Sequence, residues 1–521
     1  MGIKIMMLAV FFAVMIGIGM YCRRHSTDVS GFVLGGRSVG PWLTAFAYGT
    51  SYFSAVVFVG YAGQFGWKYG IAATWAGIGN TIIGSLMAWV ILGRRTRIMT
   101  QHLDSATMPQ FFEARFGSPA LKIAASVITF IFLIPYTASL YNGLSRLFGM
   151  AFDIDYTVCV IVMAVLTGIY VIAGGYMATA INDFVQGIIM LFGITAVILA
   201  VLNSKGGFLA AIDGLARVSD ETVSTTPGVF ASFFGPDPVN LLGVVILTSL
   251  GTWGLPQMVQ KFYAIRSEKS IATGTVVSTF FSLIIAGGCY FLGGFGRLFS
   301  DQIDIKANGF DSVIPTMLSG LPDILIAVVV ILVLSASMST LSSLVLTSSS
   351  TMTLDLLKGR FIQEMDEKKQ VFVMRCLIVV FVVISVVLAI IQYKSSVTFI
   401  AQLMGVSWGA LAGAFLAPFL YGLYYKKTTK AAVIVSFVFG VGMELVQLAV
   451  SLGWLDVSSV AVLAFVFKNS LYSGVFAMVG GLILVPLVSL VTQKTKPANV
   501  DAMFECYNVT KTVEITDSLG D

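Results

Sequence analysis

Ten hydroxyl side chains crowd into one of the most apolar parts of this chain. The stretch VLSASMSTLSSLVLTSSS, residues 333–350, follows the run PDILIAVVVI and reads as a membrane helix. At about 100° per residue, four of its hydroxyls would fan over roughly half of the helix circumference: Ser339, Thr340, Ser342 and Ser343. Hydroxyl and carbonyl oxygens are hard, uncharged ligands, suited to a monovalent cation that is released again, whereas a carboxylate cage suits calcium or magnesium. Alternatively, such hydroxyls bond back to carbonyls of their own helix and allow close packing.

Three further stretches place polar or helix-breaking residues inside apolar spans. In AYGTSYFSAVVFVG, Gly49 and the hydroxyls up to Ser54 allow unwinding, and unwound carbonyls can face a cation. In TSLGTWGLPQMVQKF, Gly251, Gly254 and Pro256 can kink or break the span, and Trp253 and Gln257 could line a substrate site. In ATAINDFVQG, Asp183 opens a span. The alternatives are a packing seam, a simple proline kink and a helix cap.

The composition is that of a protein with many membrane spans. Hydrophobic residues make up 57% of the chain and charged residues 11%, with a mean hydropathy of +0.91. Soluble proteins carry about 25% charged residues, so this chain cannot cover a water-facing surface. The basic residues fall in short loops, which argues against nucleic acid as a partner. Scattered cysteines, two histidines and the absence of a phosphate-binding loop argue against a metalloenzyme or an ATPase.

A bilayer needs about 20 apolar residues per helix, which predicts about thirteen spans. The first, 3–22, lacks a cleavage site and is expected to be a retained helix. The remaining spans are expected at 40–64, 71–93, 119–148, 155–175, 179–202, 238–258, 270–297, 321–353, 371–393, 397–423, 430–453 and 471–492.

Basic residues predict the orientation in the cell membrane. One set of loops carries most of the Lys and Arg, including Arg94, Arg95, Lys261, Lys426 and Lys494. The positive-inside rule puts these loops in the cytoplasm, with the N-terminus outside and the C-terminus inside. Two long outside loops, 203–237 and 298–320, are expected to form short surface helices or partial lids.

Three motifs resemble signature regions of the sodium/solute symporter family: GGRSVGPWLTAFAYGTSYFSA, GIYVIAGGYMATAINDFVQG and LSASMSTLSSLVLTSSS. The resemblance runs from about residue 30 to 430 and implies an all-α integral membrane fold, a five-plus-five inverted repeat of the leucine-transporter type. The implied divisions are an extra helix in 1–25, a first repeat in 38–202, an outside loop in 203–237, a second repeat in 238–425, two helices in 428–493 and a cytoplasmic tail in 494–521.

The same resemblance implies a sodium site between the first span of repeat one and the third span of repeat two. Its oxygens would be the carbonyls of Thr50, Phe53 and Ala336 and the hydroxyls of Ser339 and Thr340. A second sodium, or assistance to ion release, would involve Asp183, Ser342 and Ser343. The number of sodium ions stays open, as does the oligomeric state.

The resemblance also implies a substrate site against the two broken spans. The candidate lining residues are Ser51, Tyr52, Ser54, Asn80, Tyr136, Trp253, Gln257 and Gln402. Val56 and Val57 stand where sugar and sialic acid carriers have polar residues, which removes partners that a sugar needs. Tyr52 stands where proline carriers have an aspartate, and the run SYFSAVVFVG resembles pantothenate and monocarboxylate carriers.

We therefore expect sodium-coupled import of a small carboxylate or amino acid, such as pantothenate, a monocarboxylate or proline, and no enzymatic activity. Alternatives are a proton-coupled or uncoupled carrier of the same fold and, less in keeping with the short tail, a membrane sensor.

Overall fold

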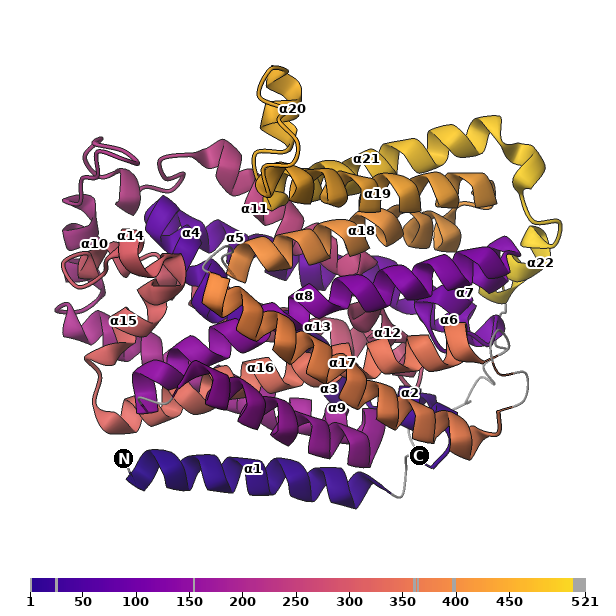
Figure 1. Ribbon diagram of the computed structural model, residues 1–521, viewed down its shortest axis with the longest axis horizontal. Coiled ribbons are helices and arrows are strands. Elements are labelled where there is room, and N and C mark those ends of the chain that lie inside the picture. The colour runs from indigo at the N-terminus through magenta and orange to yellow at the C-terminus, as the bar shows by residue number, and fades with distance from the viewer. Residues whose placement is uncertain are drawn as a thin grey trace, which may run out of the picture.

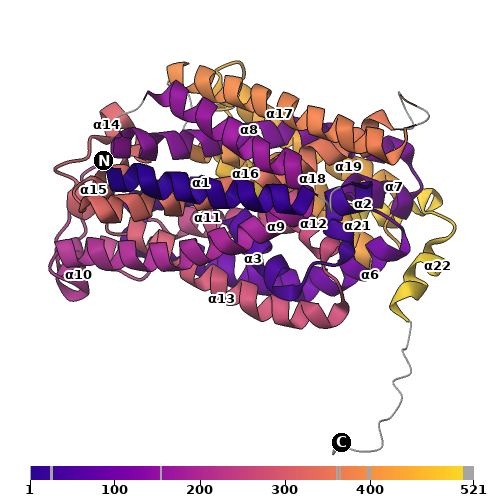
Figure 2. The ribbon, with the colours of Figure 1, turned by 90° about the horizontal axis from the view of Figure 1, so that it is seen from below.

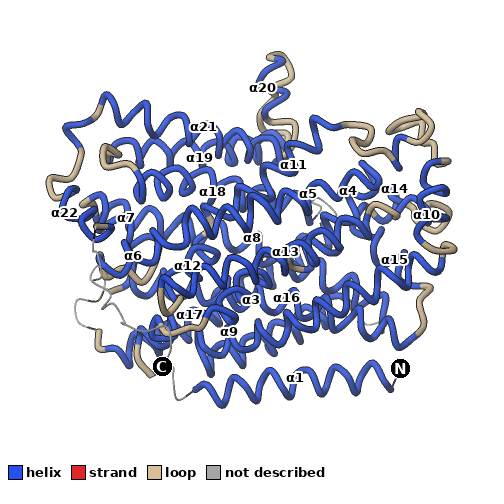
Figure 3. The backbone as a smooth tube through the Cα atoms, turned by 180° about the vertical axis from the view of Figure 1, so that it is seen from behind, coloured by secondary structure: helices blue, strands red, loops and turns tan. Residues whose placement is uncertain are grey.

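The protein is a bundle of long helices, and the axes of most of them are roughly aligned with one another (Figure 1). The computed structural model describes residues 2–23, 27–152, 155–358, 362, 365–395 and 400–508. Within these ranges no β-strand occurs, as the tube in Figure 3 makes plain. Helices suit an apolar chain because each segment satisfies its own backbone hydrogen bonds without water. The predicted all-helical fold class is confirmed.

Nine long helices of the described residues form most of the bundle: α1 (Gly2–Cys22), α8 (Pro119–Phe152), α9 (Tyr156–Ser204), α13 (Glu268–Gly293), α16 (Asp323–Thr351), α17 (Glu367–Ser395), α18 (Ile400–Tyr424), α19 (Lys430–Ser451) and α21 (Ser470–Val491). Four helical segments follow one another from residue 74 to 102: α5 (Thr74–Gly79), η5 (Asn80–Met87), η6 (Trp89–Gly93) and α6 (Arg94–His102).

The predicted number of thirteen spans is not confirmed by helix length and composition. In the described part of the chain ten helices qualify, or eleven if one bent pair counts as a span. The difference has two sources. Helix α9 covers two predicted spans in one run, with a bend at Gly175 (φ 57°, ψ −148°). The continuous helical run Val56–His102 joins the end of the predicted span 40–64 to the whole of the predicted span 71–93.

Two spans are broken where the sequence indicated. Helix α3 (Pro41–Tyr52) ends before Phe53, and η3 (Val56–Tyr61) and α4 (Ala62–Tyr69) continue beyond a non-helical Ser54. Helix α11 (Pro238–Leu250) and the turn η8 (Gly251–Gly254) meet α12 (Pro256–Ala264) at a bend of 49°. A proline fits the first position of α12 because its missing N–H would be unpaired there anyway. Each break leaves backbone groups free to contact other elements.

Helix α16 lies in the interior of the bundle. From Val329 to Thr351 every side chain on it is buried, and it packs against α3, α8, α9, α12 and α17. Figures 1 and 2 show α1 along the outside of the bundle beside α9, with α19 and α21 on the opposite side in Figure 1. The hydroxyl-rich stretch therefore faces protein around its whole circumference.

Polar contacts join the helices at each end of the bundle. At one end, the ammonium of Lys4 on α1 lies 2.9 Å from the carboxylate of Asp323 on α16 and donates to the Ala151 carbonyl of α8. At the other end, the guanidinium of Arg115 donates to the carbonyls of Gly422, in the last turn of α18, and Tyr425, directly after α18. The first residues of the predicted spans 3–22 and 321–353 therefore lie at the same end of the bundle.

Short helices occupy the connections, as expected for the two long loops. The first long loop holds α10 (Phe208–Ala216) and η7 (Val229–Ala231), and the second holds α14 (Ile305–Asn308), η10 (Phe310–Ser312) and α15 (Val313–Ser319). The others are α2 (Val29–Leu34), η2 (Gly35–Arg37), η4 (Gly70–Ala73), α7 (Met108–Phe116), η9 (Gly296–Phe299), η11 (Met352–Leu357), α20 (Ala461–Val466), η12 (Gln493–Thr495), α22 (Val500–Phe504) and η13 (Glu505–Tyr507).

Candidate functional site

The end of α3 presents free carbonyl oxygens to the middle of α16. Thr50 and Ser51 lie in the last turn of α3, where no further helical turn follows to bond their carbonyls. The Ser339 hydroxyl lies 3.1 Å from the Thr50 carbonyl oxygen, and the Thr340 hydroxyl lies 3.2 Å from the same oxygen. Side chains of α16, which come almost 290 residues later in the chain, therefore contact the carbonyl oxygen that the break in α3 leaves exposed.

The same two hydroxyls also reach the Ala336 carbonyl, one turn earlier on α16. Their oxygens lie 3.2 Å (Ser339) and 3.1 Å (Thr340) from it, and Thr340 lies 3.4 Å from the Ser51 carbonyl. We call these five oxygens the oxygen cluster: the carbonyls of Thr50, Ser51 and Ala336 and the hydroxyls of Ser339 and Thr340.

The oxygen cluster is rich in lone pairs and poor in hydrogens. Each hydroxyl carries a single hydrogen, so two hydrogens serve three carbonyl acceptors. All of these residues are buried, with Thr50, Ser339 and Thr340 at 0% exposure. A monovalent cation is the kind of ligand that satisfies several neutral oxygens at once, because the hydroxyl hydrogens can rotate away and turn lone pairs inward.

Four of the five predicted sodium ligands thus meet, and Phe53 stands apart. It follows α3 directly in extended backbone (φ −105°, ψ 102°), and its ring stacks on that of Tyr52 with centroids 4.2 Å apart. Its carbonyl is not among the oxygens that Ser339 and Thr340 contact.

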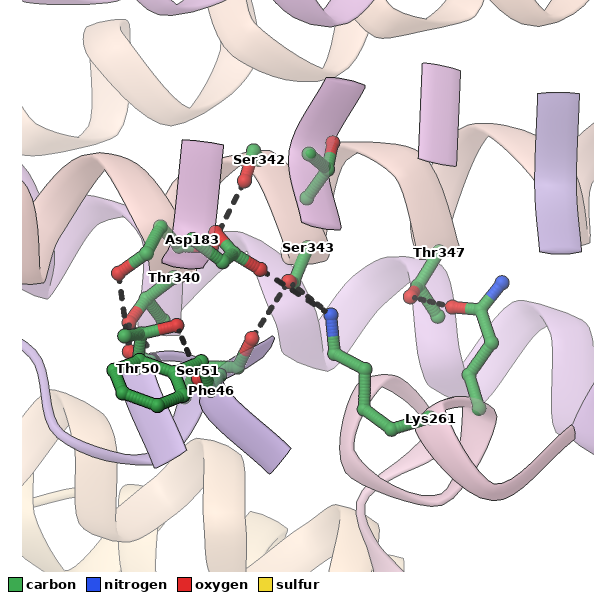
Figure 4. Close-up of polar contacts among 12 residues, drawn as sticks. Phe46, Thr50, Ser51, Asp183, Lys261, Thr340, Ser342, Ser343 and Thr347 are labelled. Atoms are coloured by element: carbon green, nitrogen blue, oxygen red, sulfur yellow. Dashed lines mark hydrogen bonds and ion pairs between the residues drawn. The ribbon is translucent and has the colours of Figure 1, made fainter. Parts of the chain in front are cut away.

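A second polar group, which we call the lysine cluster, lies one turn further along α16 (Figure 4). The Ser343 hydroxyl is 2.8 Å from the Ser51 hydroxyl of α3, and it accepts a hydrogen bond of 2.9 Å from the ammonium of Lys261 on α12. The same ammonium lies 3.8 Å from the carboxylate of Asp183 on α9. The lysine cluster consists of Ser51, Asp183, Lys261 and Ser343, from four different helices.

The expectation that Lys261 lies in a cytoplasmic loop is wrong. The predicted span ended at residue 258, whereas α12 continues to Ala264, so Lys261 is helical and its side chain is only 2% exposed. The sequence did carry a signal, because MVQKFYA keeps Lys261 within an apolar run five residues after Pro256.

Ser342 takes no part in the lysine cluster through its hydroxyl. That hydroxyl donates 2.9 Å to the Ser339 carbonyl within α16. Of the three residues predicted for a second ion, Asp183 and Ser343 therefore share a neighbour in Lys261, while Ser342 bonds along its own helix.

The predicted substrate residues divide into aromatic and amide groups. Tyr52 and Tyr136 gather around Trp408 of α18, which the sequence analysis missed, with ring centroids 6.2 and 6.0 Å from it. All three rings are buried. No local pattern marked Trp408, because only the packing of α18 against α8 and η8 brings it to the break in α3.

Hydrogen bonds already engage several of the other candidates. The Tyr52 hydroxyl donates 2.5 Å to the Thr248 carbonyl, and the Asn80 amide oxygen accepts from the Thr248 and Ser249 hydroxyls. The Trp253 indole donates 2.9 Å to the Ile83 carbonyl.

Ser54 and the two predicted glutamines behave differently from one another. The Ser54 hydroxyl accepts from the Val56 N–H and so caps the turn after the break. Gln257, at the second position of α12, is 1% exposed, and neither atom of its amide has a partner among the described residues. The side chain of Gln402 lies outside the described part of the structure. Gln257 therefore has unused hydrogen-bonding capacity at both amide atoms, and the Tyr136 hydroxyl and the Asn80 amide nitrogen also lack a partner among the described residues.

Neither the oxygen cluster nor the lysine cluster is built from several carboxylate or imidazole side chains. Among the described residues, no three His, Cys, Asp or Glu side chains lie together so that they could hold a metal ion. The site is built from neutral oxygens, one buried ion pair and aromatic rings.

Comparison with known proteins decides the family. The model of the sodium:solute symporter family matches residues 32–440. This chain belongs to the sodium:solute symporter family. Its members are transporters rather than enzymes, and this chain is a membrane transporter with many spanning helices.

Curated relatives of this symporter-family chain include proline carriers. It is 27% identical over 457 residues to the osmoregulated proline transporter OpuE of Bacillus subtilis, covering 87% of this chain and 90% of that one. It is 29% identical over 454 residues to the sodium/proline symporter of Staphylococcus aureus, covering 85% of each.

A solved relative supports the fold. The substrate-bound outward-open structure of a Na+-coupled sialic acid symporter aligns with a TM-score of 0.72 at 16% identity, over 94% of this chain and 98% of that one. The fold of this symporter-family chain is that of leucine-transporter-type carriers, as the family resemblance implied.

Proposed function

We propose that this chain is a sodium-coupled symporter that imports a small solute bearing a carboxylate, such as an amino acid or a monocarboxylate, by alternating access. The observation that carries the proposal is the oxygen cluster, in which the broken end of α3 and the middle of α16 offer five neutral oxygens at one point. The family is named for sodium, and the curated relative in Staphylococcus aureus is a sodium/proline symporter.

Sodium in the oxygen cluster would couple the two repeats. It would bind α3, the first helix of one repeat, to α16 in the other. Ion binding would then favour the arrangement in which the solute site beside the break is complete. The sodium gradient supplies the driving force, since one charge moving through 100 mV is worth about 2.3 kcal/mol.

For the solute, the proposal rests on Gln257 and the aromatic rings. The free Gln257 amide lies in the first turn of α12, where backbone N–H groups favour a negative group without any arginine. Tyr52, Tyr136 and Trp408 offer an aromatic wall next to the break, in which the Tyr136 hydroxyl and the Trp408 indole N–H have no partner among the described residues. Val56 and Val57 are buried in η3 and offer no hydrogen bonds to a sugar, which favours a small carboxylate over a polyol.

We further propose that the end of the bundle bearing Arg95 and Arg115 faces the cytoplasm and the end bearing Lys4 faces outside. Although Lys261 no longer counts as a loop residue, the other loops at the end bearing Arg95 and Arg115 still carry most of the Lys and Arg.

The test is uptake of labelled solutes by proteoliposomes with an inward sodium gradient. Proline, pantothenate and pyruvate form the first panel, with choline replacing sodium at fixed pH as the comparison. We expect uptake of at least one solute in sodium and little in choline. Uptake that persists in choline but follows a proton gradient would contradict sodium coupling.

A pair of matched variants tests the ion site itself. Ser339→Ala removes a hydroxyl that bridges α16 to α3, whereas Ser337→Ala removes one that donates only to Val333 within α16. We expect Ser339→Ala to raise the sodium concentration for half-maximal uptake strongly and Ser337→Ala to leave it unchanged. Equal behaviour of the two variants would refute the proposed ion site.

A further inference from the structure

The lysine cluster holds a positive charge in the place where the sequence suggested a second ion. The Lys261 ammonium donates to the Ser343 hydroxyl at 2.9 Å and lies 3.8 Å from the Asp183 carboxylate. The Ser51 hydroxyl adds a further oxygen, 2.8 Å from that of Ser343. A monovalent cation already lies beside one carboxylate and one hydroxyl, and that hydroxyl is hydrogen-bonded to a second (Figure 4).

Neighbouring contacts fix this ammonium in position. The preceding residue, Gln260, accepts from the Thr347 hydroxyl of α16 at 2.8 Å and donates to the Val33 carbonyl of α2 at 3.1 Å. These bonds set the rotation of α12 against α16. The ring of Tyr176 on α9 lies 5.2 Å from the Lys261 nitrogen, which adds a cation–π contact on another side.

Charge balance leaves no room for a second mobile cation beside Lys261. The side chains of Asp183 and Lys261 are 0% and 2% exposed, and neither carboxylate oxygen of Asp183 accepts a hydrogen bond from the described residues. Buried charges persist when they are paired, and one carboxylate balances one positive charge. A sodium ion at Asp183 would stand against the ammonium with no further negative group to offset it.

We propose that the ammonium of Lys261 takes the place of a second sodium ion, so that this chain binds a single sodium, in the oxygen cluster. This inference rests on the proposed sodium-coupled function. Lys261 acts as a tethered cation that links α12 to α9 and α16 directly and to α3 through the Ser343 hydroxyl, while the mobile sodium one turn away links α3 to α16. Asp183 is then the counter-ion of a side chain and not a ligand of transported sodium.

The test counts sodium ions on the purified, full-length protein with radioactive sodium in equilibrium dialysis, so no solute is needed. We expect one sodium per molecule for the unmodified protein. Lys261→Met removes the ammonium and leaves Asp183, and we expect two sodium ions per molecule and a sigmoidal binding curve. In the double variant Asp183→Asn with Lys261→Met, the carboxylate is also gone and the count returns to one.

Two controls separate this effect from general loss of charge or fold. Lys261→Arg keeps the positive charge and should stay at one sodium. Lys122→Met removes a lysine that pairs with Glu113 at 2.6 Å, far from the lysine cluster in the chain, and should also stay at one. Lys261→Gln serves as a second neutral variant, and size-exclusion profiles identify the folded proteins.

Each count decides the matter. Two sodium ions on the unmodified protein, or a single sodium on folded Lys261→Met and Lys261→Gln, overturns the tethered-cation proposal. One sodium on the unmodified protein supports it even where a variant does not fold. Failure of the proposed sodium coupling gives a different result, because the unmodified protein would then bind no sodium or would transport its solute without sodium.

Discussion

Replacing Thr340 by valine removes one oxygen from the oxygen cluster and little else. The Thr340 side chain is 0% exposed, and its hydroxyl lies 3.1 to 3.4 Å from the carbonyls of Ala336, Thr50 and Ser51. Valine has nearly the same shape, so the change leaves no cavity. The variant therefore reports on the oxygen itself and on what that oxygen binds.

The magnitude follows from the charge of the bound partner. A hydrogen-bonding group facing a charge contributes about 1.5 to 3 kcal/mol, whereas a neutral hydrogen bond contributes about 0.5 to 1.5 kcal/mol. At about 1.4 kcal/mol per factor of ten, loss of the Thr340 oxygen should raise the sodium concentration for half-saturation about 10- to 150-fold. The loss of folding free energy measured without sodium should be smaller than the loss of sodium-binding free energy, because only neutral hydrogen bonds are then removed.

The assay is a sodium titration of intrinsic tryptophan fluorescence or of the melting temperature, repeated for uptake once a solute is known. Thr340→Ser keeps the oxygen and should stay within about 3-fold of the unmodified protein, since less than about 0.7 kcal/mol then separates them. A folded Thr340→Val variant with an unchanged sodium requirement would refute the assignment of this hydroxyl to the ion.

Two more predictions concern the solute and a contact outside the membrane. Gln257→Leu should raise the solute concentration for half-maximal uptake about 10-fold or more, because an amide facing a carboxylate is worth about 1.5 to 3 kcal/mol; an unchanged value in uptake assays would place the solute elsewhere. Burial alone would raise the pKa of Asp220, but hydrogen bonds from Arg297 and Thr222 hold that pKa at about 2, below the ordinary 3.8. This contact stabilises the fold above the ordinary pKa and is lost as pH falls from about 4 toward 2. Melting temperatures of the unmodified protein and Asp220→Asn should therefore differ at pH 6 and converge near pH 2, and parallel curves would contradict it.

The helix breaks and the oxygen-rich stretch could be predicted from local sequence. Glycine, proline and hydroxyl residues at 49–54 and 251–256 oppose a regular helix whatever surrounds them, and α3 and α12 end and begin there. The ten hydroxyls mark residues 335–350 as an unusual stretch of an apolar span, but the choice of Ser339 and Thr340 as ion ligands came from the family resemblance. Which carbonyls they reach depends on packing.

Contacts between distant helices could not be predicted in the same way. The partner of Lys261 is Asp183 on α9, 78 residues away, and nothing in the neighbourhood of either residue specifies the rotation that brings them together. Counting basic residues also favours assigning any lysine near the end of a span to a loop. Likewise, no local pattern specifies that the indole N–H of Trp253, a predicted substrate residue, donates to the Ile83 carbonyl 170 residues earlier in the chain.

The proposed tethered cation at Lys261 would limit how steeply the carrier can concentrate its solute. With one sodium per cycle, a membrane potential of 100 mV contributes about 2.3 kcal/mol and a tenfold sodium gradient about 1.4 kcal/mol, which caps accumulation of an uncharged or zwitterionic solute near 500-fold. Two sodium ions would square that ceiling and double the ions to be pumped out again. With Lys261 as the proposed tethered cation, the carrier would therefore suit uptake at a low ion cost from surroundings in which its solute is not scarce.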